Sequence, residues 1–229
     1  MLLKLSGHGG YVSCCPFLNK DDNHILTGCG DGIVRLWNVK TGDRISELRE
    51  HTKDITDISV LDRNIFAASS YDGNCSIWDL RTSKLIYRYI GNNQDILSVA
   101  FHPSGNSLAI GNEIGDVSIY EMRAMAEITK FSMVDEEKEL NEEKTDESDG
   151  NTLNTISPEI RSLSFSKSGR LIYASFKDKV VEWDTLKNEC ISKIHHSNVV
   201  SSCAISPDGK ALATACWDNM VRIWTPNKK

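Results

Sequence analysis

The stretch TGCGDGIVRLW, residues 27–37, joins a tight aspartate-containing turn to an alternating run that ends in tryptophan. Runs of this kind end in an aromatic residue five times, at 33–38, 75–79, 117–121, 180–184 and 221–225. The aromatic residues are 41 positions apart from Trp37 to Trp78, 42 from Trp78 to Tyr120 and 41 from Trp183 to Trp224. The interval from Tyr120 to Trp183 is 63 residues, so one unit repeats five times with a single insertion.

Each unit has the pattern of an antiparallel four-strand meander. An alternating run such as 96–101 is followed by a turn such as 206–209, a small-residue strand such as 212–215, and the aspartate turn with its aromatic-ended strand. The segment before each unit supplies the fourth strand of the blade. A period of about 40 to 45 residues with Gly-His and Trp-Asp markers is the signature of WD40 repeats. The sequence therefore predicts an all-β WD40 β-propeller domain over 1–229, with repeats ending near Trp37, Trp78, Tyr120, Trp183 and Trp224.

The histidines and aspartates of the units fit one structural device. In WD40 repeats, the Gly-His histidine, the turn aspartate, a Ser or Thr and the final Trp form a buried hydrogen-bonded set, and a buried aspartate without such partners is costly. Because the same combination recurs, we interpret it as architecture and not as a catalytic triad or a metal site. The complete sets are His8, Thr27, Asp31 and Trp37 in the first unit and His196, Thr214, Asp218 and Trp224 in the last.

The other three units depart from this pattern. The second unit has Ala68 at the position of the hydroxyl, and the fourth has no histidine and an aspartate one residue closer to its tryptophan. The third unit matches least. The residues concerned are His51, Asp72 and Trp78 in the second unit, Asp178 and Trp183 in the fourth, and Asn92, Ile114 and Tyr120 in the third.

Charge and cysteine content exclude several classes of protein. The net charge of −6 comes from 135–149, which holds nine acidic and two basic residues, while the rest of the chain carries 24 basic and 23 acidic residues. A nucleic-acid partner is therefore disfavoured. The acidic insertion, 132–157, is expected to be disordered. Seven scattered cysteines without a CxxC pair predict reduced core residues. Without a signal peptide or a membrane span, we expect a cytoplasmic protein with no direct membrane insertion.

Four segments resemble, in the family's own order, the heterotrimeric G-protein beta subunit. They are HGGYVSCCPFL at 8–18, VAFHPSGN at 99–106, IRSLSFSKSGRL at 160–171 and CWDN at 216–219 with the run to Trp224. The Cys-Cys pair and the Ser-Lys-Ser-Gly-Arg run are not general WD40 features. The resemblance covers nearly the whole chain except the acidic insertion and corresponds to the last five of that family's seven blades.

This resemblance implies a non-enzymatic signalling subunit that needs no cofactor. The face with the Gly-His loops and aspartate turns would bind the GDP-form alpha subunit and, after its release, effector proteins. It would bring the chain to the inner face of the plasma membrane through these partners. The family's helix against the gamma subunit has no counterpart here, so gamma binding is not supported. The family's contact positions fall on Tyr11, Asp54, Asp95 and Trp217, and on Thr56 and Glu113, where the family has methionine and aspartate.

Two questions stay open at this level. A ring of five blades must either close under strain, with 1–5 as the fourth strand of the last unit, or stay an open arc with exposed strand edges. The function has an alternative too, a general WD40 scaffold that assembles another complex without G-protein pairing. A catalytic propeller is disfavoured because the sequence offers no convergent acid, base and nucleophile. Trp217 is the foremost binding candidate because tryptophan is favoured as an interface anchor.

Overall fold

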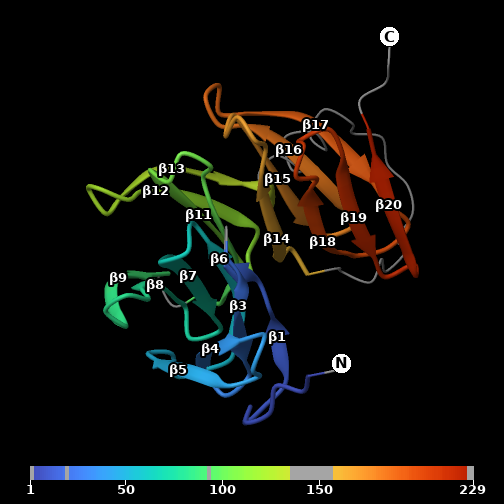
Figure 1. Cartoon of the computed structure of the whole chain (residues 1–229). Helices are drawn as coiled ribbons and strands as arrows, with labels where there is room; N and C mark the ends of the chain where they lie inside the picture. Colours follow the sequence, from blue (N-terminus) through green and yellow to red (C-terminus); the bar gives the residue numbers. More distant parts are fainter. Residues whose placement is uncertain (1–2, 19–20, 92–93, 135–156, 226–229) are drawn as a thin grey trace, which may run out of the picture.

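A computed structural model describes residues 3–18, 21–91, 94–134 and 157–225, which form 20 β-strands in five antiparallel sheets (Figure 1). The first sheet contains β1 (Val12–Cys14), β2 (Phe17–Leu18), β3 (Asp21–Cys29), β4 (Ile33–Asn38) and β5 (Arg44–Arg49). The second contains β6 (Ile55–Val60), β7 (Ile65–Ser70), β8 (Asn74–Asp79) and β9 (Lys84–Ile90). The third contains β10 (Ile96–Phe101), β11 (Ser107–Asn112), β12 (Asp116–Glu121) and β13 (Ala126–Ser132). The fourth contains β14 (Ile160–Phe165), β15 (Leu171–Phe176), β16 (Lys179–Asp184) and β17 (Glu189–His195), and the fifth β18 (Val200–Ile205), β19 (Leu212–Cys216) and β20 (Met220–Trp224).

Each sheet is one blade of a β-propeller, as the 41-residue period predicts. Blades 2, 3 and 4 are four-strand meanders in sequence order, and blade 5 has three strands in the described part of the chain. In blade 1, Pro16 lies between β1 and β2 and has no N–H to donate to a ladder, so the inner strand is split into two short pieces that both pair with β3. The first strands of the blades face the common centre (Figure 1).

The core lies between the blades. In blades 2 to 5, the side that carries the final aromatic residue packs on the outer apolar face of the blade before it. Between blades 1 and 2, for example, Phe66 and Trp78 lie in one cluster with Val34 and Leu36. Because the side chains alternate along each strand, one strand serves the blade before it with one face and the blade after it with the other.

Hydrogen bonds between inner strands add to this packing. The Ser13 hydroxyl donates to the Ile55 carbonyl across blades 1 and 2, and the Ser162 hydroxyl donates to the Cys203 carbonyl across blades 4 and 5. The Asp57 carboxylate accepts from the Val99 N–H of blade 3. Side chains of one blade therefore fix the height of the next blade along the axis.

The arc is open between blade 5 and blade 1, which is one of the two outcomes considered above. The outer face of blade 5 is exposed, with Val221 and Ile223 at 73% and 72% of their maximal accessibility, and the inner-strand residue Val12 of blade 1 is 44% exposed. The alternative pairing of the segment 1–5 with the last blade is not seen among the described residues, because Leu3 lies in no strand and near Gly42 of blade 1.

Three further expectations concern the chain as a whole. Nearly all of the acidic insertion, 132–157, lies outside the described residues. The seven cysteines are free thiols, of which Cys29, Cys75, Cys203 and Cys216 are buried and Cys15 is exposed. Within the described residues, the search for a helix with the length and apolar character of a membrane span finds none.

Candidate protein-binding face

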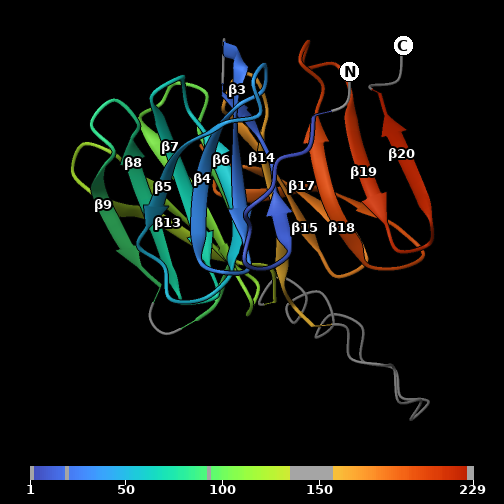
Figure 2. The ribbon, with the colours of Figure 1, turned by 60° about the horizontal axis from the view of Figure 1, so that its bottom comes forward.

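The Gly-His loops and the aspartate turns lie at one end of the arc, the lower end in Figure 2. Equivalent backbone hydrogen bonds join a turn to a loop in four blades. They run from the N–H groups of Gly30, Tyr71, Glu113 and Trp217 to the carbonyl groups of Tyr11, Asp54, Asp95 and Val199, respectively. The residue before the turn-aspartate position, which is Ile114 in blade 3, therefore occupies the same place in each of these blades, directly beside the loop that precedes the first strand.

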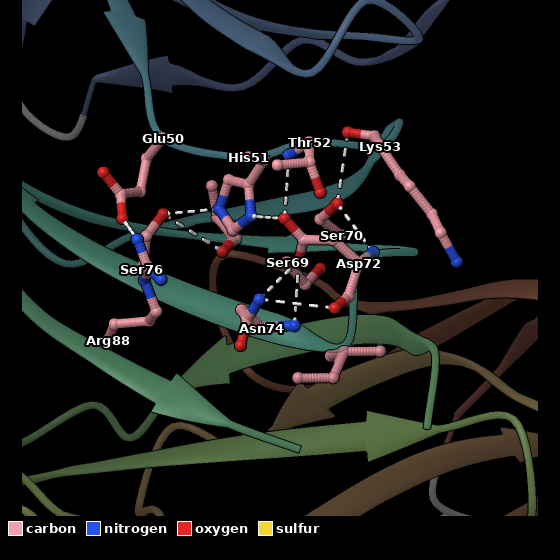
Figure 3. A network of polar contacts seen from close by, with 12 residues as sticks. Glu50, His51, Thr52, Lys53, Ser69, Ser70, Asp72, Asn74, Ser76 and Arg88 are labelled. Carbon is pink, nitrogen blue, oxygen red and sulfur yellow. Dashed lines mark hydrogen bonds and ion pairs between the residues drawn. The ribbon is translucent and has the colours of Figure 1, made fainter. Parts of the chain in front are cut away.

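The most complete polar set belongs to blade 2 (Figure 3). Trp78 Nε1 donates to Ser76 Oγ at 3.0 Å, Ser76 Oγ lies 2.7 Å from His51 Nε2, and His51 Nδ1 lies 3.0 Å from Asp72 Oδ2. A neutral His51 protonated at Nδ1 fits this chain, because it accepts from Ser76 and donates to Asp72. Burial lowers the pKa of His51 and favours that neutral form. The hydroxyl missing at Ala68 is supplied by Ser76, its cross-strand partner in the β7–β8 ladder.

Blades 1 and 5 use a threonine on the second strand, as predicted. Thr27 Oγ1 accepts from Trp37 Nε1 at 2.8 Å and lies 2.9 Å from His8 Nε2. In blade 5, Thr214 Oγ1 accepts from Trp224 Nε1 at 3.0 Å and lies 2.8 Å from His196 Nε2. Burial lowers the pKa values of both histidines.

The turn aspartates of these two blades are held by arginine. Arg35 donates to Asp31 at 2.7 Å, and Arg222 donates to Asp218 at 2.6 Å. Burial opposes ionisation of Asp31, but the hydrogen bonds from Arg35 and from the Gly9 N–H hold the pKa of its carboxyl well below the usual range. The hydrogen bond from Arg222 does the same for the pKa of Asp218. Each aspartate thereby fastens the turn to the third strand of its blade, β4 or β20.

Blades 3 and 4 are incomplete, in line with their sequences. The indole N–H of Trp183 is buried, and no acceptor for it lies within the described part of the chain. Its neighbours Ala174 and Val181 stand where Thr27 and Ser76 carry hydroxyls. The backbone carbonyl of Asp178 accepts from the His196 N–H of the next loop. In blade 3, Tyr120 replaces the tryptophan, burial raises its pKa, and Asn92 lies outside the described residues.

Tyr11 and Asp54, two of the contact positions that the family resemblance implies, meet at the boundary between blades 1 and 2. The Tyr11 hydroxyl donates to Asp54 Oδ2 at 2.8 Å, and this hydrogen bond, with burial, raises the pKa of Tyr11 to about 12. The Tyr11 ring lies against Gly30, where a β-carbon would come within 2.8 Å of it. Glycine at this position therefore lets the ring lie flat on the turn, with 57% of the residue exposed.

Two further positions meet around the loop before blade 3. The backbone N–H of Asp95 donates to Glu113 Oε1 at 3.2 Å, and the Asp95 carboxylate lies 3.7 Å from the Lys53 ammonium group. Thr56 is placed differently, since its hydroxyl bonds to Ser69 Oγ and to the Ile96 carbonyl, both at 2.8 Å. That hydroxyl therefore joins blade 2 to blade 3 and does not point toward a protein bound at the loop face.

Trp217 is 56% exposed at the end of blade 5. The Arg161 guanidinium of blade 4 lies over its ring, 5.1 Å from the ring centre, and is paired with Glu159. Cation–π contacts at exposed sites contribute about 0.5 to 1 kcal/mol and keep the ring in one orientation. The tryptophan is thus a large apolar surface held in place at the rim, which is the arrangement of an interface anchor.

Tyr71 is a member of this face that the sequence reasoning did not single out. It is half-buried, its pKa is raised by burial and by the nearby Glu159 carboxylate, and Arg161, Asp95 and Asp54 also lie within electrostatic range. The signal was available, because Tyr71 precedes Asp72 as Trp217 precedes Asp218. Tyr71 places an aromatic ring between the Asp54 and Asp95 loops.

The assembled face suits protein recognition. It carries three aromatic residues among carboxylates and cations, drawn from all five blades, on loops held by the polar sets below. A search of the described residues for clusters of three or more His, Cys, Asp and Glu side chains with metal-binding geometry finds none.

Fold and face together define a WD-repeat interaction domain. The chain belongs to the WD40 family, described as "WD domain, G-beta repeat", which matches residues 1–38, 42–79, 83–116 and 188–225. The matched residues include β17 of blade 4 but none of β14, β15 or β16.

Within that class, the chain is similar to curated proteins named guanine nucleotide-binding protein subunit beta. It is 32% identical to the protein from Zea mays over 234 residues, 31% identical to that from Saccharomyces cerevisiae over 244 residues, and 30% identical to that from Arabidopsis thaliana over 235 residues. Each alignment covers 96% of this chain and 57% or 58% of the relative. The chain therefore spans little more than half the length of these relatives.

Proposed function

We propose that the chain is a non-enzymatic, G-protein beta-like signalling subunit that binds the GDP form of a G-protein alpha subunit, and effectors in its absence, through the face described above. The names of its relatives support the class of partner. The observation that carries the proposal is that five residues from distant parts of the sequence lie at one end of the arc: Tyr11, Asp54, Asp95, Glu113 and Trp217.

The chemistry of the face supports a protein ligand with a basic and apolar contact surface. Asp54, Asp95 and Glu113 present carboxylate groups between the aromatic rings, and such groups attract cations on a partner and fix its register. Trp217 and Tyr11 supply apolar area at the two ends of the set, where removal of the ring would uncover the partner's apolar contact.

The test is capture of a GDP-loaded alpha subunit by the immobilised chain, measured by biolayer interferometry. Trp217→Ala and Asp54→Ala are each expected to weaken binding about tenfold or more, since truncating an anchoring aromatic or charged contact costs about 2 kcal/mol or more. Leu186→Ala is the matched control, because Leu186 is 80% exposed but lies in the turn between β16 and β17. That turn is at the opposite end of blade 4 (Figure 2), so its variant should bind like the wild type.

The alternative is a WD40 scaffold that assembles another complex. A folded wild-type chain that captures no alpha subunit, in either nucleotide state, would leave this second function. Equal losses in Leu186→Ala and Trp217→Ala would show that binding does not use the proposed face.

A further inference from the structure

Blade 3 keeps one hydroxyl of the polar set, but its aromatic ring is smaller and the loop sequence before its first strand contains no histidine. Ser118 stands two residues before Tyr120, as Ser76 stands two residues before Trp78 in blade 2. In blade 2, the Ser76 hydroxyl lies between the Trp78 indole N–H and the His51 imidazole, and Figure 3 shows its contact with His51. The side of blade 3 that faces blade 2 therefore carries less ring volume than the same side of blade 2.

A cavity of about 300 Å³ lies on this side, between blades 2 and 3. Its most buried lining residues are apolar or aromatic, namely Tyr89, Ile96 and Ile110, which are at most 6% exposed. Ile90 and Lys130 also line it and are exposed, so the cavity reaches the surface. The volume is at the lower end of the range for small-molecule sites. Because both blades are covered by a neighbour on each side, the cavity belongs to the interior of the arc.

Several polar side chains around the cavity are already held in place. Asn112 Oδ1 accepts from the Ile114 N–H at 3.2 Å and from the Asp116 N–H at 2.9 Å, and Asn112 Nδ2 donates to Gln94 Oε1 at 2.8 Å. The Lys130 ammonium group lies 2.7 Å from the buried Asp116 carboxylate. A site whose side chains are fixed in advance loses less conformational freedom when a ligand binds.

The remaining polar groups of the cavity favour a ligand that donates hydrogen bonds. The Tyr120 hydroxyl is within hydrogen-bonding range of Ser118 and of the Glu127 carboxylate, and all three side chains line the cavity. Their oxygens have lone pairs for further donors. Since Asp116 balances the charge of Lys130, the Glu127 carboxylate sets the charge of the cavity and disfavours an anion.

From this combination we infer that the cavity between blades 2 and 3 binds a small planar nitrogen heterocycle of the imidazole type, the chemical class that includes the purine bases. Its ring N–H donates to the oxygens of Ser118, Tyr120 and Glu127. Its ring packs on the apolar lining, beside the Tyr89 and Tyr120 rings, whose centroids are 4.5 Å apart. This site is distinct from the loop face and stands whether or not the chain binds an alpha subunit.

The probe is benzimidazole, compared with indene, which has the same fused-ring shape without nitrogen. Each compound is titrated into the ¹⁵N-labelled full chain, and the backbone amide shifts of the residues around the cavity are followed by NMR. We expect saturable binding of benzimidazole with a Kd of about 1 mM or below, a range open to a ligand of roughly ten heavy atoms. Indene at the same concentration should cause shifts at least tenfold smaller, because it has no N–H to donate.

Two variants locate the site. Tyr120→Trp introduces the larger ring that the other blades carry, so it should fill the cavity and abolish benzimidazole binding. Tyr173→Trp is the matched control, because Tyr173 lies on β15 of blade 4, outside the cavity, and this variant should bind like the wild type. Ser118→Ala removes an acceptor without filling the cavity and should weaken binding about tenfold.

Three results would overturn the inference. The first is that benzimidazole causes no saturable shifts around the cavity. The second is that indene binds equally well, which would make the cavity an apolar void without recognition of nitrogen. The third is that Tyr120→Trp and Ser118→Ala both bind like the wild type, which would place the ligand elsewhere. Far-UV circular dichroism of the variants confirms that any loss comes from the site and not from misfolding.

Discussion

Ser76 shows how one hydroxyl can be moved between strands without changing the network it serves. It stands on β8 opposite Ala68, and it joins Trp78 to His51 as Thr27 joins Trp37 to His8. The side chain that satisfies a buried indole N–H can therefore come from either member of a cross-strand pair.

Ser76→Ala is expected to lower the free energy of unfolding by about 1 to 3 kcal/mol, because the buried nitrogens of Trp78 and His51 lose their shared partner. Urea unfolding followed by tryptophan fluorescence measures the change. The rescue control is Ala68→Ser in the Ser76→Ala background, which returns the hydroxyl to the strand used by Thr27. A single variant as stable as the wild type, or a double variant no better than the single, would contradict the assigned role.

The buried histidines predict how stability depends on pH. Burial lowers the pKa of His51 below the unfolded value of 6.5, so the unfolded chain binds a proton at a higher pH than the folded chain. Stability should therefore be complete above about pH 6.5 and fall as the pH drops below it. The lowered pKa values of Asp31 and Asp218 add a second loss only below their unfolded value of 3.8.

Thermal unfolding between pH 7 and pH 5 tests this dependence. In His51→Gln, the melting temperature should fall less between pH 7 and pH 5, because the glutamine does not titrate. His195→Gln controls for the substitution itself, since His195 is exposed and stands beside the half-buried His196. A wild-type melting temperature that stays constant or rises on acidification would be incompatible with neutral buried histidines.

At the scale of the element, the sequence of strand β16 explains why the buried indole N–H of Trp183 lacks a hydrogen-bond acceptor among the described residues. Val180 and Val181 are both fully buried but face opposite sides of the strand, and only Val181 lies on the side of Trp183. Since the Trp183 indole N–H is without an acceptor in the described residues, Val181→Thr places a hydroxyl where Ser76 serves blade 2.

Val181→Thr is expected to leave stability unchanged or raise it by about 1 kcal/mol, the net contribution of one hydrogen bond. Val180→Thr buries the same hydroxyl on the apolar side and should lose about 1 to 3 kcal/mol. Urea midpoints of the two variants measure the difference. If both variants lose the same free energy of unfolding, the indole N–H of Trp183 already has another hydrogen-bond acceptor.

Much of the element level could be predicted from the period of the sequence. The aromatic-ended runs fixed the third strand of every blade, and the two threonine-based polar sets follow from the Gly-His and aspartate positions. Two features could not be predicted, because they depend on which residues pair across a ladder: Ser76 as the replacement hydroxyl and the turn of Thr56 away from the loop face. Tyr71 was predictable in principle from its place before Asp72.

At the scale of the whole molecule, the open arc makes the two ends less stable than the middle. Interior blades are covered on both faces, but the outer face of blade 5 is exposed and β20 pairs with one strand among those described. In repeat architectures, stability is approximately the sum of each unit and its interfaces, so a unit with one interface opens more easily.

Hydrogen exchange followed by mass spectrometry should therefore show a gradient along the chain. Peptides from β19 and β20 are expected to exchange faster than peptides from β7, β8, β11 and β12, which lie in blades with two covered faces. The comparison between β12 and β20 is internally controlled, since they are equivalent strands of different blades. Uniform protection over all five blades would mean that the ends are covered in solution.

The exposure of Cys15 turns the first blade into its own chemical reporter. Cys14 beside it is largely buried, and burial raises its pKa to about 12, which suppresses the reactive thiolate. An alkylating reagent added to living cells would therefore modify Cys15 in preference to Cys14 while blade 1 is folded. Labelling of Cys14 as well as Cys15 would report that blade 1 has opened, without a tag on the protein.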